Sequence, residues 1–235
     1  MSEWPGALRR DPPRSSITYL LRAPLAAWLR REAAALEPGG CRILDVGCGV
    51  KPYYPFFRPY AREYVGVDVA GNPAADLEGT VERLPVADAS FDVVLCTQVL
   101  EHCEDPDQAV RELRRVTAPG GRVLASTHGV EVYHPAPEDH WRWTHTGLER
   151  LFARNGDWER VVVEPGGGTA SCLGMLVAIY VDLLAKRARV RPLARLVVAA
   201  VNRAAPALDR RVPDLSRPTP GSLIANYHIS ATTPR

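Results

Sequence analysis

The stretch RILDVGCGVKPYYPFF, residues 42–57, decides the fold class of this chain. Its apolar start predicts a buried strand over residues 42–46, and that strand runs directly into Gly47-Cys48-Gly49. Glycine lets a backbone turn sharply, and it lets a ligand approach without meeting a β-carbon. A strand that ends in two such glycines therefore predicts a ligand site at its carboxyl end.

Strand and helix patterns alternate along the chain around this stretch. Strands are expected over residues 42–46, 64–69, 91–96, 122–126, 158–163 and 226–232, and helices over residues 15–36, 107–116 and 146–154. We expect Pro24 to bend or split the first helix, the turn Pro119-Gly120-Gly121 to close the second, and Thr146 to cap the third. This alternation predicts an α/β fold, in which a largely parallel sheet carries helices on both faces.

The composition is that of an ordinary soluble globular protein. Of the 235 residues, 46% are hydrophobic and 24% are charged, and the formal net charge of +2 indicates no particular partner. The five cysteines lack zinc-ligand spacing, the first residues lack a signal-peptide core, and no run of 18 apolar residues occurs. We therefore expect free thiols, no metal site and a cytoplasmic location.

Three classes of ligand compete for the glycine pair. A dinucleotide-binding G-x-G-x-x-G pattern is broken by Pro52, and a phosphate-binding P-loop fails because Lys51 follows no correctly spaced second glycine. Two acids fit a third class. Asp68 ends the next expected strand, 23 residues after Asp45, where an acid can accept hydrogen bonds from ribose hydroxyls. Asp45 would repel a diphosphate and attract an ammonium group, and ribose plus ammonium without phosphate describes S-adenosylmethionine.

Four blocks carry a resemblance to a known family. The blocks ILDVGCG, YVGVDV, ERLPVADASFDVVLCTQVLEH and ELRRVTAPGGRVLAS lie in order between residues 43 and 126. They resemble the class I S-adenosylmethionine-dependent methyltransferases, in particular the ubiquinone-methyltransferase-like branch. The resemblance implies a Rossmann-like sheet of seven strands, mostly parallel, with the last strand antiparallel. We expect one domain over residues 1–235, with a helical cover at 15–37, the cofactor-binding core at 42–165, a helical insertion at 170–211 and the final strand within 222–233.

The resemblance also implies which residues meet the cofactor. Asp45, Gly47 and Gly49 would line its methionine end, with Cys48 between the glycines as a small apolar filler. Asp68 would hold the ribose, Val69 would lie against the adenine, Thr80, Val81 and Glu82 would meet the adenine edge, and Thr97 and Gln98 would border the cofactor toward the acceptor. Thr80 departs from the family, in which many members have Asp. Pro52 and Pro55 predict that the helix after the glycines is short or shifted.

Methyl transfer to oxygen or nitrogen can require a general base, for which we consider three histidines as candidates: His102, His140 and His145. The segment YHPAPEDHWRWTHTGL, residues 133–148, follows the expected strand at 122–126. We predict that it forms a lid over the acceptor, with substrate contacts from Tyr133, His134, Trp141 and Trp143. The alternative is a tryptophan-anchored loop that only seals the fold.

Nucleic acid is not the expected acceptor. The chain has no Asn- or Asp-Pro-Pro-aromatic motif after the 91–96 strand and no Pro-Cys pair, so it lacks the signatures of amino-methylating and cytosine-C5 enzymes. We expect a small molecule such as a sugar, a lipid head group or a secondary metabolite, with O- or N-methylation favoured over C-methylation. A non-catalytic scaffold or regulatory module that keeps the cofactor fold is the alternative.

The segment 170–211 does not follow the pattern of the core. Its first part, residues 171–185, is apolar apart from Asp182 and is expected to be too short to span a bilayer. A second helix is expected after a break near Pro192, and residues 186–211 hold eight Lys or Arg and one acid, Asp209. This composition predicts peripheral contact with a membrane surface or a partner. The alternatives are that the helices cover the sheet, shape the acceptor pocket or form a homodimer seam.

Overall fold

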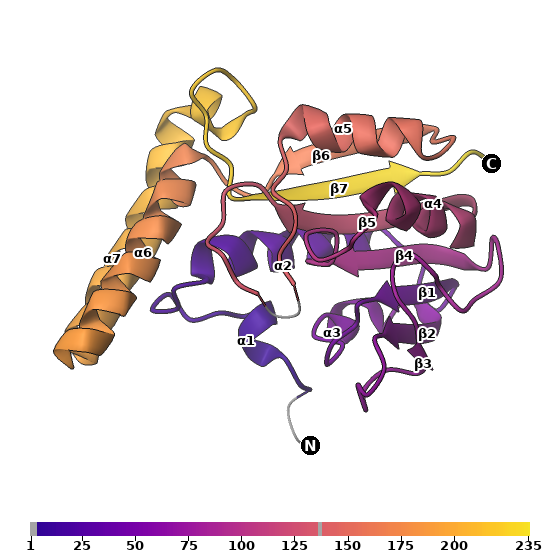
Figure 1. The fold of residues 1–235 in the computed structure, drawn as a ribbon, viewed down its shortest axis with the longest axis horizontal. Coiled ribbons are helices and arrows are strands. Elements are labelled where there is room, and N and C mark those ends of the chain that lie inside the picture. The colour runs from indigo at the N-terminus through magenta and orange to yellow at the C-terminus, as the bar shows by residue number, and fades with distance from the viewer. Residues whose placement is uncertain (1–3, 136–137) are drawn as a thin grey trace.

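The computed structural model of the chain describes residues 4–135 and 138–235. In these residues one sheet of seven strands has the order β3-β2-β1-β4-β5-β7-β6 (Figure 1). The strands are β1 (Cys41–Val46), β2 (Ala61–Asp68), β3 (Leu77–Glu78), β4 (Phe91–Thr97), β5 (Thr117–His128), β6 (Arg160–Pro165) and β7 (Asn226–Thr232). Only β7 runs against its neighbours, because it pairs antiparallel with both β5 and β6. The predicted mostly parallel sheet with an antiparallel last strand is therefore confirmed.

Helices cover both faces of this sheet. The helices of the described residues are α1 (Ala7–Arg10), α2 (Tyr19–Ala34), α3 (Tyr54–Phe57), α4 (Pro106–Val116), α5 (His145–Arg154), α6 (Thr169–Ala188) and α7 (Arg191–Arg211), followed by the 3-10 helix η1 (Pro213–Ser216). Consecutive strand residues pack into opposite layers: Ile43 lies in a cluster with α2 and α3, and Leu44 in a cluster with α4 and α5. Both side chains are fully buried, which explains why the central strands are almost continuously apolar.

Several element boundaries differ from the prediction. Pro119-Gly120-Gly121 does not form a separate closing turn, because α4 ends at Val116 and β5 starts at Thr117. Gly120 takes a left-handed φ of 71° at the start of β5, and its N–H donates to the Pro234 carbonyl. Pro24 does not split α2, which runs through it without interruption. Thr144, rather than Thr146, caps α5, because its Oγ1 accepts a hydrogen bond from the Gly147 N–H at 3.1 Å. The helix after the glycines, α3, is short as predicted.

Helices α6 and α7 form an antiparallel hairpin beside the sheet (Figure 1). The prediction that the first of them is too short to span a bilayer was wrong: α6 has 20 residues and is long and apolar enough by length and composition alone. However, 39% of the most apolar 18-residue stretch of α6 is buried inside the fold. The break between the helices falls at Arg189, whose φ is 58°, and Pro192 lies in the first turn of α7.

Candidate active site

The sheet changes direction of winding between β1 and β4, since β2 and β3 lie on one side of β1 and β4 and β5 on the other. In open α/β sheets, ligands bind outside the carboxyl ends of the strands at such a point. Asp45 lies near the carboxyl end of β1, Asp68 ends β2, Thr97 ends β4 and His128 ends β5. The fold therefore gathers Asp45, Asp68 and Thr97, which were predicted from the sequence, along one edge, and it adds His128, which was not.

The two glycines after β1 play different parts. Gly47 has a φ of 64°, and a β-carbon on it would lie 2.4 Å from Val99 Cγ2. Gly49 has a φ of 52°, but the nearest atom to its β-carbon position is Arg9 Nη1 at 3.7 Å. Gly47 is therefore required by packing as well as by its backbone angle, while Gly49 leaves open space beside the loop. That space suits a ligand in contact with the backbone.

Asp68 ties the ends of β1 and β2 together. Its Oδ2 accepts hydrogen bonds from the Gly49 N–H and from Asn72 Nδ2, both at 2.7 Å, and its Oδ1 accepts the Val69 N–H at 2.8 Å. A carboxylate offers about four acceptor sites, so three are used here. One site is left for a ligand hydroxyl, and displacement of the Asn72 amide would free a second.

Asp45 is buried beneath the glycine loop, with only 3% of its surface exposed. The Tyr64 hydroxyl donates to its Oδ2 at 2.7 Å. Burial is the main reason that the pKa of Asp45 is raised to about 7, and the Tyr64 hydrogen bond and nearby Lys51 oppose that rise. A cation placed against this carboxylate would favour its charged form. The arrangement thus fits the ammonium group of a methionine moiety.

An N-terminal segment, residues 4–10, covers the loop that follows the glycines. Arg10 is buried and donates from Nη1 to the Pro52 and Pro5 carbonyls and from Nη2 to the Trp4 carbonyl. Trp4 Nε1 donates to the Lys51 carbonyl at 2.8 Å. This segment also brings the Arg9 guanidinium to Gly49. Sequence reasoning missed this role of the segment, because no motif or spacing links it to residues 40 positions away.

The residues predicted for the adenine end are divided between surface and core. Val69 is exposed beside Asp68, but Val81 is buried in the core cluster that includes α4. Glu82 anchors its loop, since its Oε1 accepts the Glu104 N–H at 2.9 Å. Cys48 is buried, and burial raises the pKa of its thiol to about 12, consistent with a packing role.

A polar group spans the ends of β4, β5 and β7. Gln98, directly after β4, has a φ of 57° and turns its Nε2 toward Ser126 Oγ at 2.8 Å and Asn226 Oδ1 at 3.2 Å. In the described part of the chain, the buried Gln98 Oε1 and Asn226 Nδ2 lack hydrogen-bond partners. Buried polar atoms are normally paired, so these two indicate a place for water or for polar atoms of a ligand.

Glu101 and His128 form a buried pair at the same edge. His128 Nε2 lies 3.0 Å from Glu101 Oε1, and Thr127 Oγ1 donates to Glu101 Oε2 at 2.9 Å. Burial raises the pKa of Glu101 to about 8 and is the first cause of a His128 pKa lowered to about 3, with nearby His134 adding to the latter. Burial therefore disfavours the charged form of both side chains.

His134 extends this pair toward the surface. Its ring lies edge-on to the rings of His128 and His102, with centroids 5.0 and 5.1 Å away. Its Nδ1 lies 3.3 Å from the Val132 carbonyl and 3.5 Å from Asp139 Oδ2. Arg142 binds the same carboxylate through two nitrogens and holds the pKa of Asp139 well below its usual range. His134 is thus a partly exposed imidazole beside a fixed carboxylate.

The three histidines predicted as bases have other partners. His102 Nδ1 donates to the Glu138 carbonyl, and burial lowers its pKa. His140 Nε2 lies 3.0 Å from Glu138 Oε2. Both ring nitrogens of His145 have partners: Nε2 lies 3.1 Å from the Val163 carbonyl, and Nδ1 lies 3.5 Å from the Glu149 carboxylate. Among the histidines of this loop region, His134 is the one oriented by a carboxylate that is itself held in place.

The predicted lid segment lies across the ends of β4 and β5; its residues 136 and 137 are outside the described residues. The N–H groups of His140 and Trp141 both donate to the Glu101 carbonyl, and the Trp143 N–H donates to the His128 carbonyl. The rings of Trp141 and Trp143 stack 5.6 Å apart, and Trp141 Nε1 donates to the Cys103 carbonyl. Tyr133 is 75% exposed. The described part of the segment is therefore anchored over the polar edge through its backbone.

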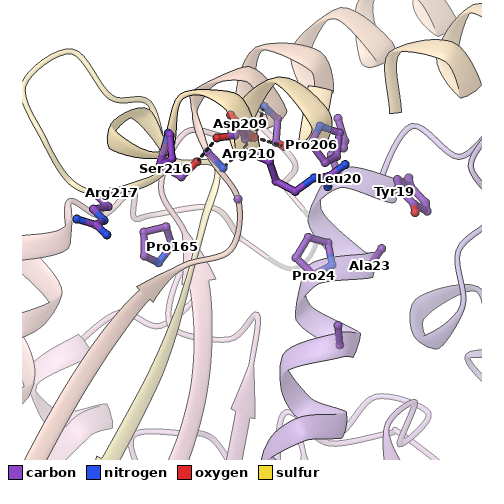
Figure 2. Close-up of a pocket in the computed structure, with 15 residues that line it drawn as sticks. Tyr19, Leu20, Ala23, Pro24, Pro165, Pro206, Asp209, Arg210, Ser216 and Arg217 are labelled. Atoms are coloured by element: carbon purple, nitrogen blue, oxygen red, sulfur yellow. Dashed lines mark hydrogen bonds between the residues drawn. The ribbon is translucent and has the colours of Figure 1, made fainter. Parts of the chain in front are cut away.

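A separate hollow lies beside the end of β6, where Pro165 lines it. An open hollow of about 710 Å³ is lined by residues of α2, the start of α6, the end of α7 and η1 (Figure 2). Asp209, which lines it, already accepts hydrogen bonds from the first turn of α6. Neither Asp45, Asp68 nor either glycine of the loop lines this hollow, so it is separate from the candidate active site.

Known proteins are similar to this chain over the same core. A family model described as "Methyltransferase domain" matches residues 44–125. An uncharacterized methyltransferase of Mycobacterium sp. strain KMS is 39% identical over 114 residues, which cover 44% of this chain and 45% of that protein. A malonyl-[acyl-carrier protein] O-methyltransferase of Erwinia pyrifoliae is 41% identical over 102 residues, 39% of each chain. The chain thus matches less than half the length of these relatives.

Solved structures share the fold over a larger part of the chain. A SAM-dependent methyltransferase from Archaeoglobus fulgidus aligns over 97% of both chains with a TM-score of 0.56 and 14% identity. A Haemonchus contortus phosphoethanolamine N-methyltransferase 2, solved in complex with S-adenosyl-L-methionine, aligns over 100% of this chain and 61% of its own with a TM-score of 0.55 and 15% identity. At such identities these likenesses show a shared fold.

Proposed function

We propose that this chain, whose residues 44–125 form the core of a class I S-adenosylmethionine-dependent methyltransferase domain, transfers a methyl group to an oxygen or nitrogen atom of a small molecule. One observation carries the proposal. A buried carboxylate, an open glycine and a strand-end carboxylate, provided by Asp45, Gly49 and Asp68, adjoin at the point where the sheet reverses. This donor set suits an ammonium group, a close backbone contact and a ribose diol.

These residues fit the family's cofactor. Asp45 would hold the ammonium group, Asp68 the ribose hydroxyls and Arg9 the carboxylate of the methionine moiety, because its guanidinium reaches Gly49. When bound, S-adenosylmethionine supplies a methyl group on a sulfonium sulfur. Loss of this methyl group converts the cofactor to S-adenosylhomocysteine. The protein's own part in the reaction is to orient the acceptor, to exclude water and to move the acceptor's proton.

The proton of the acceptor would pass to His134. Its Nδ1–H donates toward the Val132 carbonyl and Asp139, so its Nε2 carries the lone pair that can take a proton. The imidazolium that results would be stabilised by the Asp139 carboxylate, which Arg142 holds in place. The unpaired amide atoms of Gln98 and Asn226 would orient the acceptor. Trp141 and Trp143 would exclude water above it.

The relatives' names support oxygen or nitrogen as the acceptor atom. The Erwinia relative is named as an O-methyltransferase and the Haemonchus neighbour as an N-methyltransferase. Within this chain, the hydrogen-bonding groups and the histidine beside the ends of β4 and β5 suit an acceptor with an ionisable O–H or N–H. A sugar, a lipid head group or a secondary metabolite offers such groups.

Calorimetry with S-adenosylhomocysteine tests the cofactor assignment. Asp68→Ala should weaken binding about 10- to 100-fold, since loss of a partner for buried polar groups costs about 1–3 kcal/mol. Asp92→Ala is the matched control, because Asp92 Oδ2 accepts the Arg42 N–H at 2.7 Å at the opposite edge of the same sheet. If both folded variants bind S-adenosylhomocysteine with equal affinity, Asp68 does not hold the ribose.

Turnover tests the role of His134. With an acceptor found by screening, His134→Ala should lower kcat about 100-fold while the affinity for S-adenosylhomocysteine is unchanged. His145→Ala, which removes a histidine bound to the Val163 carbonyl, serves as the comparison. An unchanged kcat in His134→Ala would show that the base lies elsewhere.

A non-catalytic scaffold is the second candidate function, favoured by the segment that is closely anchored over the strand ends through its backbone. Such a protein would bind S-adenosylmethionine and form no S-adenosylhomocysteine with any acceptor. Formation of S-adenosylhomocysteine that depends on an added acceptor excludes it.

A further inference from the structure

The end of the α6–α7 hairpin that lies far from η1 is unusual in its surface. We call residues 182–197 the hairpin tip; it comprises the last two turns of α6, the link at residues 189–190 and the first two turns of α7. In Figure 1 the two helices run side by side away from η1 and join at this tip. The tip is therefore a projecting part of the molecule.

Large apolar side chains of the tip face outward. Between 41% and 70% of the surface of each is exposed, for Leu183, Leu184, Val190, Leu193, Leu196 and Val197. The residues buried between the helices are small, namely Ala185 and Ala194. Folded proteins usually bury their large apolar side chains, and a contiguous exposed group of them marks an interaction surface.

The same tip is strongly basic. Lys186, Arg187, Arg189, Arg191 and Arg195 are all exposed, against the single acid Asp182. Asp182 pairs with Lys186 at 2.7 Å. Among the ion pairs formed within residues 4–135 and 138–235, none involves the four arginines. Their positive charge is therefore available to a partner.

This combination identifies the partner by its chemistry. Leucine and valine side chains suit the boundary between head groups and acyl chains, and arginine suits phosphate groups at the same depth. A second copy of the tip would instead bring ten basic side chains together and leave them repelling one another. We propose that the hairpin tip attaches the protein to the surface of a membrane rich in anionic lipid.

The base of the hairpin favours surface attachment over insertion of α6. The first turn of α6 is bound to Asp209, and 39% of the helix's most apolar window is buried against the fold. Since β6 ends at Pro165 and α6 starts at Thr169, the hairpin extends from the same edge of the sheet as the candidate active site. The hairpin thus connects the tip to the edge that carries the candidate active site.

Flotation with the full chain tests the proposal. Vesicles of phosphatidylcholine with 30% phosphatidylglycerol should bind the protein at 50 mM NaCl, and binding should fall at least 10-fold at 500 mM NaCl because salt screens the arginines. Pure phosphatidylcholine vesicles should bind it at least 10-fold more weakly. Absence of binding to the anionic vesicles by folded protein at 50 mM salt overturns the proposal.

Paired variants locate the contact. The triple variant R187E/R189E/R191E should lower partitioning onto anionic vesicles at least 100-fold, since each basic residue contributes about fivefold. R58E/R62E/R150E changes the net charge equally at exposed positions elsewhere and should lower it much less. L193S/L196S should lower it about 10-fold, and L173S/L208S, half-exposed positions at the hairpin base, should not.

Size-exclusion chromatography with light scattering supplies the second measurement on the same variants. A monomer whose tip variants keep their melting temperature and lose vesicle binding supports the proposal. A dimer that L193S/L196S dissociates assigns the apolar surface to a second copy and overturns it. Equal loss of binding in the tip and control triples also overturns it, because the charge effect is then not specific to the tip.

Discussion

Gly47 and Gly49 belong to the same loop, yet the structure gives them different reasons to be glycine. Both take left-handed backbone angles, but only Gly47 has a neighbour, Val99, inside the space of a β-carbon. The sequence motif predicts the pair as a ligand loop and cannot separate the two roles, because the contact with Val99 joins residues that lie 52 positions apart.

Alanine at each position should separate stability from binding. Gly47→Ala should lower the free energy of unfolding by about 2–5 kcal/mol, from backbone strain and overpacking together. Gly49→Ala should cost only about 1–2 kcal/mol of strain but weaken binding of S-adenosylhomocysteine at least 10-fold by filling the open space. Denaturant melts and calorimetry measure the two effects. Normal cofactor affinity in Gly49→Ala would make the loop a structural turn only.

Asp45 makes cofactor affinity depend on pH. Burial raises its pKa in the folded chain to about 7, above the ordinary value of a carboxyl group, so its charge changes with pH near neutrality. By itself this group stabilises the fold most below pH about 4, and that contribution is lost as the pH rises through 7. Binding of an ammonium group requires the charged form, so the affinity should be full above pH 7.

Calorimetry with S-adenosylhomocysteine between pH 5.5 and 8 checks this expectation. Affinity should fall as the pH drops through 7, approaching about 10-fold per unit below it, since binding must then release a proton. Asp45→Asn should bind weakly at every pH and show a flat profile in this range. A wild-type profile as flat as that of the variant contradicts the role of Asp45.

At the scale of elements, α6 starts without a capping side chain from its own N-cap residue, Gly168. Asp209, near the end of α7, takes that role: it accepts hydrogen bonds from the N–H groups of Gly168, Ala170 and Ser171 and from Ser171 Oγ. The one acid in a basic stretch is thus explained by the free N–H groups and positive end of a neighbouring helix. The sequence shows the isolated acid but not the helix that it caps.

Removal of this carboxylate should loosen the hairpin. Asp209→Ala leaves buried N–H groups unpaired and should cost about 2–4 kcal/mol, with faster hydrogen exchange across residues 169–188. Asp182→Ala, which removes the other acid of the hairpin and its partly exposed pair with Lys186, should cost less than about 1 kcal/mol. Similar exchange rates in the two variants would show that Asp209 does not hold the hairpin.

At the scale of the whole molecule, the sequence predicts the sheet well and the assembly around the site poorly. Apolar strands such as residues 43–46 are recognisable because both faces of the sheet are covered. The group formed by Glu101, His128 and His134 cannot be recognised in the sequence, because it depends on adjacent strand ends and on a loop that folds back over them. His145 shows the converse error, in which a histidine prominent in the sequence engages backbone instead.

The N-terminal segment is another part of the site that the sequence does not predict, and its attachment should control cofactor affinity. Buried Arg10 fastens residues 4–10 to the Pro52 carbonyl, while Trp4 packs on Tyr54 with ring centroids 4.5 Å apart. Arg10→Ala should free the segment and with it Arg9, so that S-adenosylhomocysteine binds about 10-fold more weakly, mainly through faster dissociation. Stopped-flow and calorimetric measurements would detect this change.

Arg14→Ala is the matched control for that change, because it removes an exposed arginine four residues further on whose guanidinium lies 5.8 Å from the Tyr19 ring. Both variants should keep the melting temperature of the core within a few degrees, since the sheet and its two clusters do not involve the segment. Hydrogen exchange should rise in residues 4–10 for Arg10→Ala only. If the two variants bind S-adenosylhomocysteine equally well, the segment rests on the glycine loop without contributing to the cofactor site.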